Sequence, residues 1–367
     1  MADTPQVGTP VHELDTPILL LDLNAFERNI GRMAAFFAGK STVDLRPHAK
    51  SHKCPQIARR QIESGAVGIT CAKVSEAEVM AEAGIEDILV ANEVVGPTKV
   101  QRLAELATHC HLMVAVDDAA NIDELSSACQ KRGASLRVLV EIDIGMARCG
   151  VQPGPHALAL AQRIVDVPNL TFMGLQGYEG HLVGIVDAQE RAAKVCAAMG
   201  LLQETKTLLE MRGLPVAIVS GGGTGTYDMS SSVPPMNEIQ AGSYVFMDTK
   251  YIQVRPEFES SLTVLTTVLS RPTPERIIVD AGMKAMTHEF GWPRPIDVPG
   301  TSVVGLSEEH GKLEATEPEA VLLKPGDKTC FMPSHCCTTV NLHDDLYVVR
   351  DGVLVDVWPI AARGCAQ

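Results

Sequence analysis

The sequence has few aromatic residues and no long hydrophobic run. Phenylalanine, tryptophan and tyrosine make up 4% of the 367 residues, so the core must be mostly aliphatic. No apolar stretch approaches the roughly 18–20 residues that a membrane helix needs. The opening MADTPQVGTPVHELD lacks the basic start and apolar stretch of a secretory signal. We therefore expect a cytoplasmic protein that has no membrane partner.

Positive charge is also scarce. The chain has 31 lysines and arginines against 45 aspartates and glutamates, which gives a formal charge of −14 at pH 7. Nucleic-acid binding needs a basic surface, so we expect no nucleic-acid partner. An anionic small molecule is still compatible with this charge, because a local cluster of donors can bind phosphate in an acidic protein.

The ten cysteines follow no disulfide pattern. They are scattered along a long chain. Without a secretion signal, reduced thiols are expected. Most of them are interpreted as small buried hydrophobic residues. One pair, Cys336 and Cys337, directly follows His335 and is an exception to this interpretation.

Short β-branched runs alternate with amphipathic stretches between about residues 43 and 248. The predicted strands are 43–46, 67–70, 88–91, 112–116, 136–142, 172–176, 216–219 and 238–241. Helical patterns such as SEAEVMAEAG lie between them, and several end near a glycine. These βα units predict a (β/α)8 TIM barrel, filled with valine, isoleucine and leucine. A doubly wound open sheet is the alternative, and the count of strands favours the barrel.

After Asp248 the pattern changes. The segments SLTVLTTVLS, RIIVDAG, TSVVGL, AVLLKPGDKTCFMP and DDLYVVRDGVLVDVWPI read as strands separated by turns, with no strong helix among them. Near the N-terminus, TPILLLDL also reads as a strand, followed by a helix over AFERNIGRMAAFF. We predict a barrel domain over 20–248 and a mostly β domain over 249–367, to which we assign residues 1–19.

The first barrel strand leads into LRPHAKSHK, which contains Lys50. Residues at the carboxyl ends of barrel strands face the active site. A lysine held among cationic neighbours in a partly dry site has a lowered pKa, which frees its amine for Schiff-base chemistry. The alternative interpretation is a solvated basic turn.

A glycine-rich turn, VSGGGTGT, follows the seventh predicted strand. Such a turn lets backbone N–H groups approach a phosphate. Barrel enzymes often bind phosphate after strands seven and eight, and the eighth strand here leads into AGSY. A single glycine-rich loop is weak evidence, but two such segments in these places are stronger.

Three more side chains follow the fifth and sixth predicted strands. Arg148 lies in EIDIGMARCG, while Tyr178 and His181 lie in QGYEGH. Each alone is more often a structural residue. Their common place at strand ends makes them candidates for the mouth of the barrel.

The segment PSHCCTTVNLHD contains a His-x-Cys pair, His335 and Cys337. In a strand or extended turn the two side chains would lie on one face, because alternate residues point the same way. Imidazole and thiolate together suit Zn²⁺ or a similar metal. Two ligands fit an open site with a Lewis-acid role rather than a closed structural site. A buried pair that binds no metal is the alternative.

Together these segments resemble the fold-type III pyridoxal-phosphate enzymes, in the group of the D-threonine aldolases and D-serine dehydratases, whose barrel is alanine racemase-like. The resemblance runs from about Asp15 to Gly364. Its matching stretches are DTPILLLDL, LRPHAKSHK, KVSEAE, NEVVGP, EIDIGMARCG, GGGTG, QAGSYVFMD, VDAGMKA, EEHG and PSHCCTTVNLHD. It implies a pyridoxal 5'-phosphate cofactor, a divalent metal (Zn, Mn, Mg or Co) and a homodimer with shared active sites.

The resemblance also implies roles for single residues. Lys50 would hold the cofactor as a Schiff base, with Arg148 near the phenolic oxygen of the cofactor and Tyr178 near its ring nitrogen. The phosphate would be held by Gly222, Gly223 and Thr224, with help from Ser243 and Tyr244. The metal would be bound by His335 and Cys337 and would contact the β-hydroxyl of the substrate.

Two positions depart from the aldolase pattern. The aldolases typically have aspartate at the second metal position, where this chain has Cys337, as the dehydratases do. The aldolases also place a catalytic histidine several residues beyond the tyrosine. In YEGHLVGIVD the only histidine is His181, in a different register, and we take it as the candidate catalytic histidine. EIDIGMARCG and QAGSYVFMD look more like the aldolases.

We therefore expect a lyase that acts on D-β-hydroxy-α-amino acids. The favoured reaction is a D-threonine aldolase-like retro-aldol cleavage to glycine and an aldehyde. One alternative is a D-serine or D-threonine dehydratase, which forms a 2-oxo acid and ammonia. The others are an amino-acid racemase and a non-catalytic carrier of pyridoxal phosphate.

Overall fold

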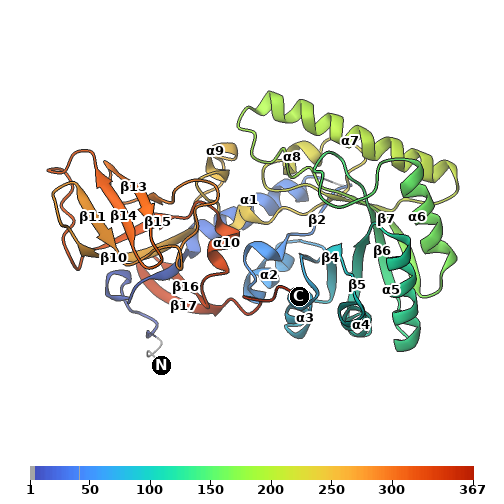
Figure 1. The fold of residues 1–367 in the computed structure, drawn as a ribbon, viewed down its shortest axis with the longest axis horizontal. Coiled ribbons are helices and arrows are strands. Elements are labelled where there is room, and N and C mark those ends of the chain that lie inside the picture. The colour runs from blue at the N-terminus through green and yellow to red at the C-terminus, as the bar shows by residue number, and fades with distance from the viewer. Residues whose placement is uncertain (1–4, 41) are drawn as a thin grey trace. The chain divides into compact units, whose positions relative to one another are not determined.

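The computed structural model describes residues 5–40 and 42–367, which divide into two compact units (Figure 1). One, here called the β unit, contains the chain up to Arg32, Ser51–Cys54 and Ser243–Arg363. The other, the barrel unit, contains Met33–Lys50, Pro55–Gly242 and Gly364–Gln367.

The barrel unit is built on an eight-stranded parallel sheet in the order β2-β9-β8-β7-β6-β5-β4-β3. Its two edges meet, because His48, just after β2, forms a parallel bridge with Thr70 of β3. The predicted (β/α)8 barrel is therefore confirmed. Its strands are β2 (Asp44–Leu45), β3 (Ile69–Cys71), β4 (Asp87–Glu93), β5 (His111–Val116), β6 (Leu136–Glu141), β7 (Leu170–Gly177), β8 (Ile218–Gly221) and β9 (Glu238–Ile239).

Helices follow the barrel strands and lie along their outer side (Figure 1). Helix α5 shows the local signals well: the Asp118 carboxylate accepts from Asn121 N at its start, and Gly133, with φ +65°, ends it. Helix α1 (Leu23–Ala38) begins in the β unit. The helices of the barrel unit are α2 (Pro55–Glu63), α3 (Val74–Glu82), α4 (Pro97–Leu106), α5 (Ala119–Arg132), α6 (Pro155–Asp166), α7 (Ala188–Met211) and α8 (Tyr227–Ser230).

The barrel interior is only partly aliphatic. Leu89, Met113 and Leu139 form a buried cluster against which Met173 and Ile218 pack. This part agrees with the expected aliphatic filling. Other inward positions carry charged and amide side chains, so the expectation of a barrel filled with valine, isoleucine and leucine is wrong for those positions.

An ion-pair network accounts for part of this polar interior. Arg46, which follows β2, donates to Glu238 Oε2 at 2.8 Å and to Asp87 Oδ1 at 2.7 Å, and Arg137 donates to Asp87 Oδ1 at 2.8 Å. Strands β2, β4 and β6 are not neighbours, so their side chains meet inside the closed sheet. Burial opposes the charge of Arg46, but the two carboxylates raise its pKa above the ordinary value.

A chain of hydrogen bonds continues from Glu238 across the next strands. Ser220 Oγ donates to Glu238 Oε1 at 2.7 Å, and Gln240 Nε2 donates to Ser220 Oγ at 2.8 Å. Gln240 Nε2 also reaches Gln176 Oε1 at 3.1 Å, and Gln176 Nε2 donates to Glu141 Oε2 at 2.6 Å. These buried polar groups are tolerated because they bond to one another.

The β unit contains a nine-stranded sheet. Strand β1 (Ile18–Asp22), predicted from TPILLLDL, lies in this sheet, antiparallel to β10 and parallel to β16. The other strands are β10 (Leu262–Ser270), β11 (Arg276–Val279), β12 (Arg294–Pro295), β13 (Thr301–Leu306), β14 (Gly311–Ala315), β15 (Lys328–Met332), β16 (Asp345–Arg350) and β17 (Val353–Pro359).

Two details of the predicted β domain are wrong. The apolar start of AVLLKPGDKTCFMP forms no strand, and Leu322 in it is 84% exposed, because nothing in the sheet pairs with it. Strand β14 (GKLEA) has no apolar run, yet it pairs with β11 and β13, and its alternate residues are buried. The unit also contains short helices: α9 (Tyr251–Val254), α10 (Cys336–Val340), and the 3-10 turns η1 (Val11–Glu13) and η3 (Ser243–Val245).

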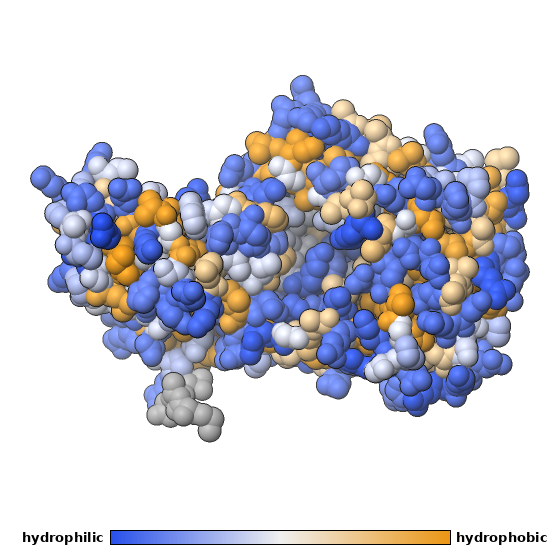
Figure 2. Space-filling view, in the orientation of Figure 1, coloured by the Kyte–Doolittle hydropathy of each residue, from blue (hydrophilic) through white to orange (hydrophobic). Residues whose placement is uncertain are grey.

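The surface fits the composition. Figure 2 shows mostly hydrophilic side chains on the visible face, with hydrophobic residues in small separate groups. Within residues 5–40 and 42–367, no helix has the length and apolar character needed to cross a membrane. All ten cysteines lie in this part of the chain, and none of them forms a disulfide bond.

We expect Glu238→Ala to lower the free energy of unfolding by about 3–5 kcal/mol, because Arg46 would keep a buried charge with one partner fewer. Urea unfolding followed by circular dichroism measures the change. The control is Glu190→Ala, which removes the exposed pair with Lys194 on α7 (2.7 Å). The control should change stability by no more than about 0.5 kcal/mol. Equal shifts in the two variants would contradict a buried ion-pair role for Glu238.

Candidate active site

Lys50 lies in the 3-10 turn η2 (Ala49–Ser51), shortly after the short strand β2. The turn is fixed locally, because Lys50 N donates to His48 Nδ1 at 3.4 Å and His48 N donates to Ala241 O at 3.3 Å. The Lys50 ammonium nitrogen lies 5.8 Å from the centre of the Tyr178 ring. Both residues follow the carboxyl ends of barrel strands.

Tyr178 is the centre of the predicted cofactor site in the barrel unit. The Arg148 guanidinium carbon lies 5.6 Å from its ring centre, a distance at which a cation is attracted to the ring. A Cβ on Gly223 would lie 3.4 Å from Tyr178 Cε2. The structure thus brings together Lys50, Arg148, Tyr178 and the glycine-rich loop, which come from four separate strand ends.

The glycine-rich loop is held by a buried carboxylate that the sequence reasoning missed. Glu179 is fully buried; it accepts from Thr226 Oγ1 at 2.7 Å, from Ser230 Oγ, and from Gly222 N at 3.3 Å. Gly222 has φ +73°, and Gly223 N donates to Thr226 Oγ1 at 3.2 Å. Thr224 is buried in the same loop. Contact of Gly222, Gly223 and Thr224 with phosphate stays a prediction.

Carboxylates at the ends of β4 and β6 were also missed. Glu141 is 4% exposed, and its Oε1 lies 3.9 Å from Arg148 Nη2. Burial and the neighbouring Glu93 raise the pKa of Glu141 to about 8. Glu93 also forms a group with Asp117 and Cys149, whose ligand atoms lie within 4.8 Å of one another. Their position at strand ends is the signal in the sequence that could have identified them.

His181 lies in the turn that follows Tyr178 and is exposed. Its imidazole packs on Gly145, where a Cβ would lie 3.0 Å from His181 Nε2. Gly145 belongs to the same loop as Arg148. The structure therefore places His181 beside this loop, and its catalytic role stays a prediction.

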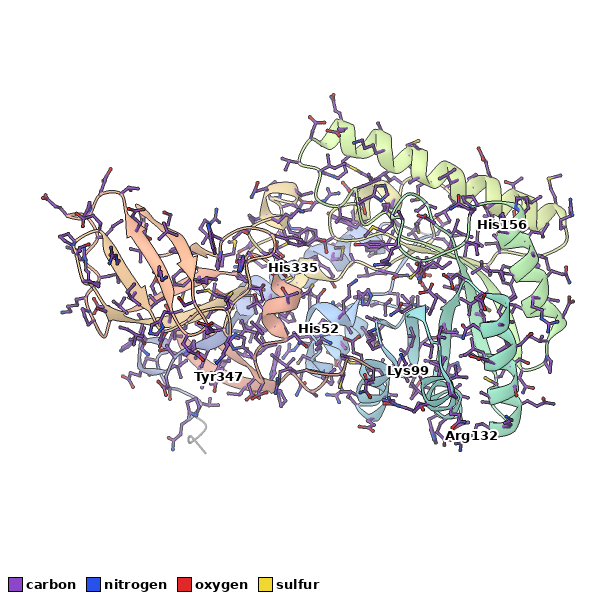
Figure 3. All side chains as sticks on the ribbon, in the orientation of Figure 1. His52, Lys99, Arg132, His156, His335 and Tyr347 are labelled. Carbon is purple, nitrogen blue, oxygen red and sulfur yellow. The ribbon has the colours of Figure 1, made fainter. Side chains whose placement is uncertain are left out.

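In the β unit, His335 and Cys337 lie at the start of helix α10, where Figure 3 labels His335. The predicted strand or extended turn is wrong here, because only His335 has extended backbone (φ −141°, ψ 124°) and Cys337 is already helical. The two side chains still lie close together. The ligand atoms of His335, Cys336 and Cys337 are all within 4.8 Å of one another.

A buried aspartate orients the imidazole. Asp248 Oδ2 lies 3.2 Å from His335 Nδ1 and accepts from Cys336 N at 3.1 Å. Burial opposes the charge of His335, but Cys337 and Asp248 raise its pKa to about 10. Cys336, whose sulfur lies 3.9 Å from that of Cys337, lowers the pKa of the Cys337 thiol, as does His335. Thiolate is the form in which cysteine binds metal.

Ser243 and Tyr244, predicted as phosphate helpers, also belong to the β unit. Ser243 Oγ lies 3.7 Å from Cys337 Sγ, and Ser51 Oγ lies 3.4 Å from the same sulfur. Tyr244 is 1% exposed, and its ring lies 5.9 Å from that of Phe258. Contact of Ser243 and Tyr244 with phosphate stays a prediction.

The side chains of the two units fit the expected cofactor, pyridoxal phosphate, and the expected divalent metal. In the barrel unit an amine, a guanidinium and a phenol converge beside a loop rich in backbone N–H groups, which suits an aldehyde cofactor that carries a phosphate. In the β unit, the His335 imidazole lies beside the Cys337 sulfur, and its Nδ1 is hydrogen-bonded to the Asp248 carboxylate. Histidine ligands of zinc are usually oriented by a carboxylate in this way.

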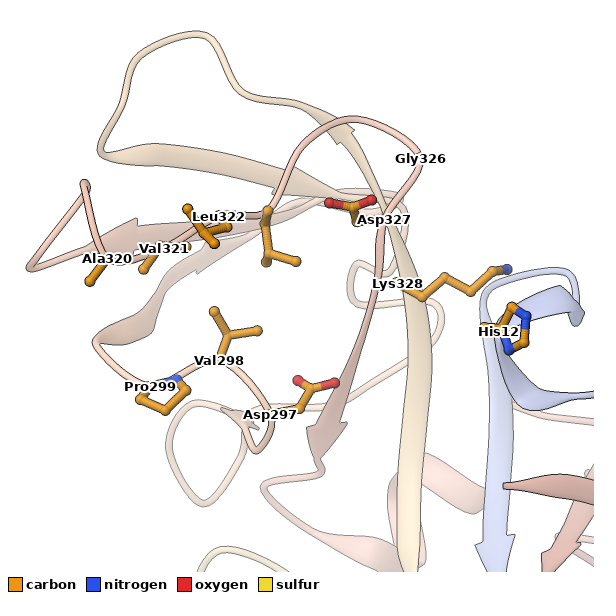
Figure 4. Close-up of a pocket in the computed structure, with 11 residues that line it drawn as sticks. His12, Asp297, Val298, Pro299, Ala320, Val321, Leu322, Gly326, Asp327 and Lys328 are labelled. Atoms are coloured by element: carbon orange, nitrogen blue, oxygen red, sulfur yellow. The ribbon is translucent and has the colours of Figure 1, made fainter. Parts of the chain in front are cut away.

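A surface hollow of about 660 Å³ also lies in the β unit (Figure 4). Its lining includes Asp297 and Asp327, which accept hydrogen bonds from Cys330 N and Lys324 N. None of the predicted site residues lines it. We assign it no part in the chemistry.

Family models match most of the chain. The alanine racemase N-terminal domain matches residues 21–250, and the putative serine dehydratase domain matches residues 261–349. The D-threonine aldolase of Arthrobacter sp is 44% identical over 366 residues, covering 99% of this chain and 96% of that protein. The 3-hydroxy-D-aspartate aldolase of Paracoccus denitrificans (strain Pd 1222) is 40% identical over 368 residues, covering 97% and 94%.

Solved structures agree. The D-threonine aldolase from Filomicrobium marinum matches with a TM-score of 0.97 and 43% identity, covering 100% of both chains. A cysteine-to-alanine mutant of a D-threo-3-hydroxyaspartate dehydratase, in the metal-free form, matches with a TM-score of 0.87 and 27% identity, covering 96% of this chain and 98% of that one. The chain therefore belongs to the fold-type III pyridoxal-phosphate lyases, in the alanine racemase-like family that contains the D-threonine aldolases and the D-serine dehydratases.

Proposed function

We propose that this protein cleaves D-β-hydroxy-α-amino acids between Cα and Cβ, as a D-threonine aldolase does, releasing glycine and an aldehyde. The observation that carries the proposal is the 44% identity to a D-threonine aldolase over 99% of the chain. The contacts described above supply groups suited to this reaction in each unit.

In the barrel unit, Lys50 would hold the aldehyde of the cofactor, and Gly222, Gly223 and Thr224 would hold its phosphate. Pyridoxal phosphate bound there supplies an electron sink for the charge that develops on Cα when the bond to Cβ breaks. Arg148 carries a fixed positive charge beside Tyr178, which suits a phenolic oxygen. The chain's own contribution is to fix the orientation of these groups.

In the β unit, His335 and Cys337 would hold a divalent ion, which supplies a Lewis acid for the β-oxygen of the substrate. Asp248 keeps the His335 ring oriented, with Nδ1 bonded and Nε2 left for the metal. His181 is the proposed base that takes the β-hydroxyl proton.

Dehydration is the second candidate, and Cys337 is the observation that favours it. Solved structures of the related D-threo-3-hydroxyaspartate dehydratase include a histidine mutant and a cysteine mutant two positions apart, the latter in a metal-free form. This spacing equals that of His335 and Cys337. In that reaction Lys50 would remove the Cα proton, and a 2-oxo acid and ammonia would form.

The wider organisation is part of the proposal. Residues 20–248 would bind the cofactor, and residues 249–367 with 1–19 would bind the metal. The absence of disulfide bonds among the ten cysteines of the described residues supports a reducing, cytoplasmic location. The resemblance to this family supports a homodimer, which light scattering on the purified protein tests.

Incubation with D-threonine distinguishes the reactions. We expect glycine and acetaldehyde in equal amounts, measured by amino-acid chromatography and an aldehyde-coupled assay. Formation of 2-oxobutanoate and ammonia would instead establish dehydration, and L-allo-threonine without cleavage would establish racemisation at Cα. Bound cofactor without any turnover would leave only the carrier function.

Replacement of Lys50 tests the cofactor site. We expect Lys50→Ala to lose the visible absorbance of the bound cofactor after dialysis and to lower kcat/KM by roughly 10³-fold or more, because the covalent link and the proton-transferring amine are both removed. Lys53→Ala is the matched control and should keep the absorbance. If Lys53→Ala loses the absorbance and Lys50→Ala keeps it, Lys50 is not the cofactor lysine.

Replacement of Cys337 tests the metal site. We expect Cys337→Asp to retain a metal but to shift its preference from Zn²⁺ towards Mn²⁺, because a carboxylate is a harder ligand than a thiolate. Competition with a chelating dye measures both affinities. Cys336→Ala, which removes the adjacent buried thiol, should lower the Zn²⁺ affinity much less than Cys337→Ala does. The opposite order would make Cys336 the sulfur ligand.

A further inference from the structure

Phe290, in the β unit, is a half-exposed aromatic residue beside the proposed metal ligand His335. The two ring centres lie 4.4 Å apart with an edge-to-face arrangement. Phe290 is 43% exposed, although it is one of only eight phenylalanines in the chain. A large apolar ring usually turns into the core. Here it leaves an apolar surface next to a predicted reaction centre.

The segment that carries Phe290 is held firmly on helix α10. Ser334 Oγ donates to Thr287 O at 2.8 Å, and the hydroxyl oxygens of Thr287 and Thr338 lie 2.8 Å apart. Thr338 also donates to the carboxylate of Glu289, the residue before Phe290. The ring is therefore positioned on the helix that contains Cys337, rather than at the tip of a loose loop.

Two carboxylates lie close to His335. Asp248 Oδ2 lies 3.2 Å from His335 Nδ1, and Glu289, the residue before Phe290, interacts electrostatically with His335. Lys250 is a nearby cation, and its ammonium nitrogen lies 4.4 Å from the centre of the Phe290 ring. This ammonium is engaged with the ring face, where a cation is attracted.

We propose that Phe290 selects the substrate class, favouring an uncharged apolar group on the β-carbon over a carboxylate. The inference rests on the proposed function, because the β-carbon carries the oxygen that a metal at His335 and Cys337 would bind. A methyl or phenyl group at this carbon would meet an apolar ring. A carboxylate would meet the same ring and would lie near the carboxylates of Asp248 and Glu289.

The group on the β-carbon is what distinguishes the substrates of two relatives of the chain. A D-threonine aldolase acts on a substrate whose β-substituent is methyl, and a 3-hydroxy-D-aspartate aldolase acts on one whose β-substituent is carboxylate. Overall identity to the two differs little, at 44% and 40%. The surroundings of His335 favour the methyl-type substrate.

The first experiment compares kcat/KM for D-threonine, D-phenylserine and D-3-hydroxyaspartate on the holoenzyme. We expect the wild type to prefer D-phenylserine to D-3-hydroxyaspartate by about 100-fold or more. Phe290→Arg should lower this ratio at least about tenfold, because a cation would replace the apolar ring. Phe290→Leu should keep the preference against the carboxylate. Trp292→Ala, which removes another exposed aromatic residue of the same segment, is the control and should change the ratio by less than about twofold.

A second experiment reads binding without turnover. Calorimetry on Zn²⁺-loaded Lys50→Ala, with and without Phe290→Arg, should show the same decrease in the affinity for D-phenylserine relative to D-3-hydroxyaspartate. Zn²⁺ affinity, measured with a chelating dye, should be unchanged in Phe290→Leu. If Phe290 only supports the His335 ring, Zn²⁺ affinity falls in Phe290→Leu and the substrate ratio does not change in Phe290→Arg.

The outcomes separate the two proposals. If no substrate is cleaved, the proposed function fails, and the calorimetric ratio still tests Phe290. If cleavage occurs but the wild type prefers D-3-hydroxyaspartate, the inference about Phe290 is overturned. Lys250 would then be the candidate that binds the substrate carboxylate. An unchanged ratio in Phe290→Arg overturns it as well.

Discussion

The ion pairs of Arg46 with Glu238 and Asp87 hold the first barrel strand in place. Strand β2 has only two residues, Asp44 and Leu45, and pairs by its backbone with an equally short β9. So short a ladder gives little stability by itself. The buried guanidinium adds a tie from β2 to β9 and another across the interior to β4. Lys50 follows Arg46 closely in the same segment, so the position of Lys50 depends on these ion pairs.

The same network explains how a polar barrel interior is tolerated. Every link from Arg46 through Ser220 and Gln240 to Glu141 joins a donor to an acceptor, so the desolvation cost of each group is offset locally. The chain of bonds ends at Glu141, beside Arg148. The hydrogen-bonded polar groups around Arg46 are thus connected to Glu141 and Arg148, the charged groups of the candidate site.

The metal pair depends on a helix start rather than on an extended segment. His335 has the extended backbone of a cap residue, and Cys337 lies in the first turn of α10, yet the two ligand atoms are close. Asp248 stabilises this arrangement by contacting both His335 Nδ1 and the backbone of Cys336. The choice of a cysteine at position 337 keeps dehydration as a second candidate, although overall identity favours cleavage.

The strand pattern of the barrel, the β-rich second part and the residue types of the candidate site could all be predicted from the sequence. These are local properties: β-branched runs, glycine turns and short motifs whose meaning does not require knowing what lies opposite. Strand β14 and the apolar segment around Leu322 show where local pattern failed, because pairing partners decide whether a segment becomes a strand.

The sequence could not predict which side chains contact one another, because those contacts depend on the folded arrangement of distant segments. The approach of Lys50 and Arg148 to Tyr178, the carboxylates Glu141 and Glu179, and the edge of Phe290 against His335 all join residues far apart in the chain. Such contacts depend on closure of the sheet and on the path of each loop. The energy that selects them comes from burial and hydrogen bonding between distant segments, and no window of neighbouring residues contains that information.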